Sequence, residues 1–192
     1  MGTGHVRYEW IDLLRGIAVV GMIWTHAANT FLDASLQDTQ GYRELSFYHG
    51  LIAPMFFWLA GYMRGLSAAK PGPRKPAGPT VKRLLMILAI GYSLHLPYLL
   101  AVHGDLSIPV LRVLLQSDVL QCLAVSCLLL LALERGLPRA LDAWAATAIG
   151  LLAILFTPTL AATTTGLIPL DAYLSKQHGS LFPLFPWVGF AC

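Results

Sequence analysis

The chain has 192 residues, of which 56% are hydrophobic and only 12% are charged, and its mean hydropathy is +0.64. Soluble domains carry about 25% charged residues. The composition therefore excludes an ordinary soluble domain and predicts a membrane protein. The net charge of +3 is small, so the positions of the charges matter more than their sum. The three cysteines, Cys122, Cys127 and Cys192, lie in apolar segments and are interpreted as small packing residues.

Apolar segments that alternate with polar loops predict an all-α, multi-pass transmembrane bundle that forms one domain over residues 1–192. A sixth span begins near Leu181 and stops at Cys192, although a span needs about 20 residues. These residues therefore either lie along the membrane interface as a hook or show that the chain is the N-terminal part of a longer protein, and we favour the second interpretation. A short surface helix is expected between residues 103 and 118, and a flexible basic linker, rich in Pro and Gly, over residues 67–83. The five full spans are expected at about 11–30, 47–66, 84–102, 119–133 and 143–161.

The basic residues predict the orientation of these spans. Cytoplasmic loops of membrane proteins carry an excess of Lys and Arg. With the N-terminus in the cytoplasm, ten of the 13 basic residues fall on that side, and only Arg43, Arg112 and Lys176 fall outside. The sequence therefore predicts a cytoplasmic N-terminus. The ten residues are Arg7, Arg15, Arg64, Lys70, Arg74, Lys75, Lys82, Arg83, Arg135 and Arg139.

The first span holds an arginine near one end and a histidine near the other. Arg15 and His26 are eleven positions apart, so on an ideal helix they lie within about 20° of one face and about 16 Å apart along the axis. Ionisable residues in a span usually face an interior or a wet cavity. One hypothesis is a stripe that binds an elongated anionic molecule. The alternative is that Arg15 reaches the inner surface and pairs with Asp12 or Glu9, while His26 only caps the span.

Other polar residues lie near the predicted outer ends of the spans. Asn29 is close to the stripe, and Asp118 and Gln121 share a helix face at the start of the fourth span. Asp118 has a simpler alternative role as the N-cap of that span. No pair of histidines has the spacing of a zinc site, so no metal is expected. The basic linker lacks interleaved aromatic residues, which argues against nucleic-acid binding and favours contact with the lipid bilayer.

Four stretches together resemble one family of transmembrane acyltransferases. They are DLLRGIAVVGMIWTH (12–26), HGLIAPMFFWLAGY (49–62), QSDVLQCLAVS (116–126) and SLFPLFPWVGF (180–190). In their order and composition they resemble the heparan-α-glucosaminide N-acetyltransferase catalytic domain and its bacterial relatives. The resemblance to bacterial relatives implies a bacterial inner membrane. The resemblance implies a membrane-bound enzyme that moves an acetyl group from cytoplasmic acyl-CoA to a sugar amine or hydroxyl on the far side. Members of these families have more spans than this chain.

The resemblance also implies roles for the polar residues. Arg15 is expected to hold the phosphates of acetyl-CoA, the acyl donor. His26 is expected to take the proton from the acceptor, with His49 as a second candidate base. The rival interpretation is a non-catalytic membrane protein, either a small transporter or a truncated homologue that packs against a partner. Homo-oligomerisation stays open. The residues expected to bind the carbohydrate acceptor are Asn29, Asp118 and Gln121.

Overall fold

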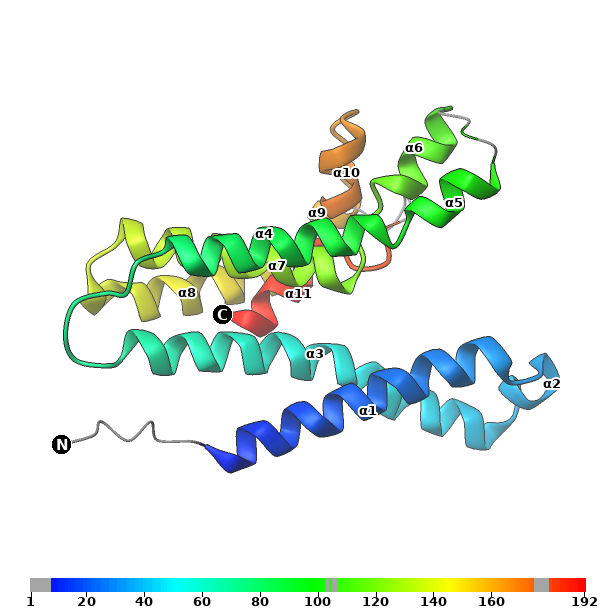
Figure 1. The fold of residues 1–192 in the computed structure, drawn as a ribbon, viewed down its shortest axis with the longest axis horizontal. Helices are drawn as coiled ribbons and strands as arrows, with labels where there is room; N and C mark the ends of the chain where they lie inside the picture. The colour runs from blue at the N-terminus through cyan, green and yellow to red at the C-terminus, as the bar shows by residue number, and fades with distance from the viewer. Residues whose placement is uncertain (1–7, 103, 105–106, 175–179) are drawn as a thin grey trace. The chain divides into compact units, whose positions relative to one another are not determined.

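The computed structural model describes residues 8–102, 104, 107–174 and 180–192, and within these ranges the chain forms only helices, turns and loops (Figure 1). The prediction of an all-α fold is thus confirmed. The chain divides into two compact units, Met1–Leu59 and Ala60–Cys192, and each is described by itself. Two basic residues used to predict the orientation, Arg7 and Lys176, lie outside the described residues.

The first unit consists of α1 (Glu9–Phe31), α2 (Ala34–Gln37) and the first part of α3 (Gln40–Ala68). The helix α1 contains the first predicted span. The helix α3 begins ahead of the second predicted span, because the segment between the spans predicted at 11–30 and 47–66 is partly helical. The helices α1 and α3 approach closely at Gly21, where a Cβ atom would lie 2.7 Å from Cδ1 of Ile52.

The second unit is built around α7 (Val119–Gly136), which has buried residues from Gln121 to Leu131. The helices α4 (Gly78–Ser93), α8 (Arg139–Leu155) and α11 (Leu184–Ala191) pack against it (Figure 1). Backbone meets backbone between α8 and α11, since a Cβ atom at Gly189 would lie 3.0 Å from the carbonyl oxygen of Gly150. The short helices are α5 (Leu96–Ala101), α6 (Ile108–Leu114), α9 (Thr157–Ala161) and α10 (Ile168–Leu174).

Two predicted spans, 84–102 and 143–161, are each interrupted by a proline. The third span is divided into α4 and α5, and the fifth into α8 and α9. A proline has no N–H group for the carbonyl four residues earlier. Pro97 and Pro158 therefore leave the carbonyls of Ser93 and Ile154 without the usual helical bond, and each helix ends there.

Three of the described helical stretches are long and apolar enough to cross a membrane. They are Glu9–Phe31, Gly78–Ala101 and Val119–Gly136. They coincide with the first, third and fourth predicted spans, and the protein is accordingly a membrane protein. The number of spans and the cytoplasmic N-terminus stay predictions.

Candidate functional site

The stripe predicted on α1 lies on an exposed face of the helix in the described chain. Both Arg15 and His26 are exposed, and Val19 between them is 48% exposed. Nη1 of Arg15 lies 3.6 Å from Oδ1 of Asp12, one turn away, which is the ion pair that the alternative interpretation predicted. Pairs as exposed as this one contribute at most about 1 kcal/mol. The guanidinium therefore remains available to an anionic ligand.

Asn29 and His49 lie close to a residue that the sequence analysis did not single out. The hydroxyl of Tyr42 donates a hydrogen bond to Oδ1 of Asn29, and this bond joins the end of α1 to the start of α3. The rings of Tyr42 and His49 meet edge to face, with 6.4 Å between their centroids. Tyr42 therefore connects one predicted acceptor-binding residue with one predicted base.

The imidazole of His49 is partly buried. Both of its ring nitrogens are buried, and neither has a hydrogen-bond partner among the described residues. A buried polar group without a partner costs about 1–3 kcal/mol of stability, so such a group needs an explanation, and catalysis or ligand binding is one of them.

The two candidate bases lie on neighbouring helices at nearly the same level. The close contact of Gly21 with Ile52 gives the alignment of the antiparallel helices α1 and α3. His26 is five residues beyond Gly21, and His49 is three residues before Ile52. At the helical rise of 1.5 Å per residue, the two histidines differ by only about 3 Å along the axis.

The remaining two predicted residues, Asp118 and Gln121, belong to the second unit. Asp118 is the N-cap of α7, and its Oδ1 accepts a hydrogen bond of 2.6 Å from the N–H of Val119. Gln121 is completely buried and packs against Gly91 of α4, where a Cβ atom would lie 2.8 Å from Cδ of the glutamine. Its amide oxygen and nitrogen have no hydrogen-bond partner in the described part of the chain.

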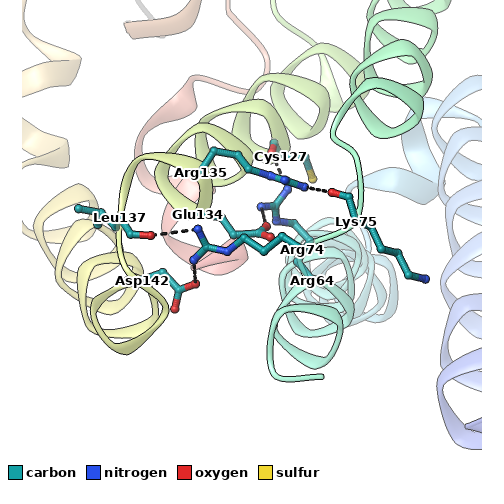
Figure 2. Close-up of polar contacts among 8 residues, drawn as sticks. All are labelled: Arg64, Arg74, Lys75, Cys127, Glu134, Arg135, Leu137 and Asp142. Carbon is teal, nitrogen blue, oxygen red and sulfur yellow. Dashed lines mark hydrogen bonds and ion pairs between the residues drawn. The ribbon is translucent and has the colours of Figure 1, made fainter. Parts of the chain in front are cut away.

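The second unit also contains a cavity that the sequence analysis did not predict. Its volume is about 480 Å³, and it lies among the end of α3, the end of α7 and the beginning of α8. At its edge, Nη2 of Arg64 lies 2.7 Å from Oε2 of Glu134, and Nη1 donates to the carbonyl of Cys127 at 3.0 Å (Figure 2). The sequence does show Arg64 and Glu134 as single charges within apolar helices, and this was the signal available for the cavity. That the two side chains pair depends on tertiary packing, which the sequence does not specify.

The loop between α3 and α4 is attached to the turn between α7 and α8. Arg74 donates to the carbonyl of Leu137 at 3.0 Å and to the carboxylate of Asp142 at 3.3 Å. Arg135 in turn donates to the carbonyl of Lys75 (Figure 2). These bonds tie the basic Pro/Gly-rich segment to two neighbouring helices beside the cavity.

The apolar helices and the charged groups placed along them define the protein as a helical membrane protein with buried polar sites. Residues 7–192 match the family described as heparan-alpha-glucosaminide N-acetyltransferase, catalytic. The chain therefore belongs to this family of membrane acetyltransferases, and the resemblance carried by the four sequence stretches is confirmed. No curated protein and no solved structure matches the chain significantly.

Proposed function

We propose that the protein transfers an acetyl group from acetyl-CoA to an amine or hydroxyl of a carbohydrate on the opposite side of the membrane. The family match over residues 7–192 is the observation that carries this proposal. The matched range includes all of the residues assigned to the site from the sequence. With the orientation predicted from the basic residues, acetyl-CoA binds from the cytoplasmic side of the membrane.

Arg15 binds the phosphates of the donor in this proposal. A guanidinium binds phosphate through two parallel hydrogen bonds. Support comes from the exposure of Arg15 and from the weakness of its ion pair with Asp12. The axial distance of about 16 Å to His26 leaves room for the extended arm of the coenzyme along α1.

His26 acts as the general base, since it is the exposed one of the two candidate bases and therefore accessible to an acceptor. It takes a proton from the acceptor nitrogen or oxygen, and the freed electron pair attacks the thioester carbonyl. The carbon–sulfur bond then breaks, and the departing CoA thiolate takes the proton from the imidazolium. His49, at the same level on α3, is the second candidate. The acceptor is held by Asn29, Asp118 and Gln121.

Acetyl transfer to a defined acceptor tests this function. Purified protein is incubated with labelled acetyl-CoA and either glucosamine, which has a free amine, or N-acetylglucosamine, which has only hydroxyls. Labelled sugar is the expected product, and the Arg15→Gln variant is expected to raise KM for acetyl-CoA about tenfold, because one charge-assisted contact is worth about 1.4 kcal/mol or more. The matched variant Arg43→Gln, in which an exposed arginine outside the stripe is replaced, should leave KM unchanged.

Two results would contradict the proposal. If neither sugar is labelled although the protein is folded and binds acetyl-CoA, the rival interpretation as a transporter or a packing partner is favoured. If Arg43→Gln raises KM as much as Arg15→Gln does, the effect of Arg15 is one of overall charge rather than of a phosphate contact.

Gln121 provides a second test, because its buried amide has no partner. Replacing it with methionine, which is similar in length, removes the unpaired groups and is expected to stabilise the protein by about 1–2 kcal/mol. If Gln121 binds the acceptor, acetyl transfer should fall at least tenfold in the same variant. Thermal unfolding and transfer are measured together, with the exposed Gln40→Met as the control. Unchanged transfer would make Gln121 a packing residue.

A further inference from the structure

The cavity in the second unit has an excess of positive charge. Its two carboxylates, Glu134 and Asp142, are each paired with an arginine, and both pairs are about four-fifths buried. Lys70 and Arg139 also line the cavity, and neither has an ion pair among the described residues. Both residues are exposed, so two cations of the lining are available to an anionic ligand, and these two residues are called the basic edge of the cavity.

The rest of the cavity wall is mostly apolar, and many of its side chains are small. Glycine and alanine at the end of α3, alanine from α8 and two leucines of α7 line it, together with Pro71, Thr147, Ala191 and Cys192. Small residues leave the space that larger side chains would fill. The cavity therefore combines a basic edge with an apolar interior, which suits a molecule that has one anionic end and one apolar end. The small residues are Gly61, Gly65, Ala68, Ala69, Ala143 and Ala146.

The beginning of α8 shows at which level of a membrane this edge lies. Trp144 is 76% exposed and Leu141 is 53% exposed, while Arg139, five residues before Trp144, is the first residue of the helix. Tryptophan is enriched at the membrane–water interface, and basic residues lie beside it at the level of the lipid headgroups. An exposed tryptophan just beyond an arginine therefore places the basic edge of the cavity at the headgroups.

We propose that this cavity binds the headgroup of an anionic phospholipid, with its phosphate between Lys70 and Arg139. The acyl chains then leave along the apolar wall. Basic pockets between transmembrane helices are known to bind anionic headgroups in this way. A coenzyme A molecule carries three phosphate groups, and two unpaired cations do not neutralise their charge. A phospholipid headgroup with one or two negative charges matches the two cations. The proposal does not depend on acetyl transfer.

Thermal unfolding in detergent tests the lipid site. The protein is measured with phosphatidylglycerol and with phosphatidylcholine, which has the same acyl chains but no net charge. At a concentration about 100 times the dissociation constant, phosphatidylglycerol is expected to raise Tm by about 5 °C or more. The double variant Lys70→Gln/Arg139→Gln should lose this rise, and Lys70→Arg/Arg139→Lys should keep it. The matched control Lys82→Gln/Arg83→Gln removes the same charge outside the cavity lining and should also keep it.

The proposal is overturned if phosphatidylcholine raises Tm equally, or if the rise persists in Lys70→Gln/Arg139→Gln. It is also overturned if acetyl-CoA gives the same rise and displaces the lipid, because the cavity then belongs to the coenzyme. The His26→Ala variant separates the two proposals, since it should lose acetyl transfer and still bind phosphatidylglycerol. Transfer without any lipid effect would leave the proposed function intact and remove the lipid site.

Discussion

Replacing His26 with alanine is expected to lower the rate of acetyl transfer by about 10²–10⁴-fold, because general base catalysis typically contributes that much. The loss should appear in kcat. The KM for acetyl-CoA should change little, since Arg15, about 16 Å away along α1, holds the donor in the proposed arrangement. Steady-state transfer of labelled acetyl to glucosamine measures both quantities, and thermal unfolding of the variant confirms that it is folded.

Two other histidines serve as comparisons for His26. His49→Ala is expected to lower transfer less than tenfold, because the ring nitrogens of His49 are covered and a substrate does not reach them without local movement. His95→Ala should leave transfer intact, since Nδ1 of His95 lies 3.2 Å from the carbonyl of Leu114 and serves a structural contact. A larger loss in His49→Ala than in His26→Ala would assign the base to α3 instead.

The sequence predicted helices well where their ends depend on local signals. The helix α7 begins at Val119, as predicted, because Asp118 caps it and a mostly apolar run follows. The breaks within the third and fifth spans were not predicted. Hydropathy continues through Pro97 and Pro158, and an apolar average does not register the loss of a single backbone hydrogen bond.

In the candidate site, too, the features that depend on local sequence were predicted and those that depend on long-range packing were not. That Arg15 and His26 share a face follows from the helical period, and the structure places both on an exposed face of α1. The bond between Tyr42 and Asn29 joins residues 13 positions apart, and that between Arg64 and Glu134 joins residues 70 positions apart. Such pairs depend on how helices pack, and no spacing in the sequence specifies them.

The largest effect on stability is expected at Gly61. The sequence showed Gly61 and Gly65 one turn apart, at the spacing of small residues that let helices approach closely. Only Gly61 meets another backbone, since a Cβ atom there would lie 1.9 Å from the carbonyl oxygen of Ala191 on α11. Gly61→Ala should therefore displace α11 and cost about 3 kcal/mol, the upper part of the usual range for overpacking.

Gly65→Ala is the matched control, because a Cβ atom at Gly65 meets nothing within 4 Å. Alanine is favoured over glycine in a helix by about 1 kcal/mol, so this variant should be as stable as the parent protein or slightly more stable. A loss of 3 kcal/mol lowers Tm by about 6–12 °C in a chain of this size. Thermal unfolding should then show opposite signs at the two positions, and an equal decrease in both would mean that α11 does not rest on α3 at Gly61.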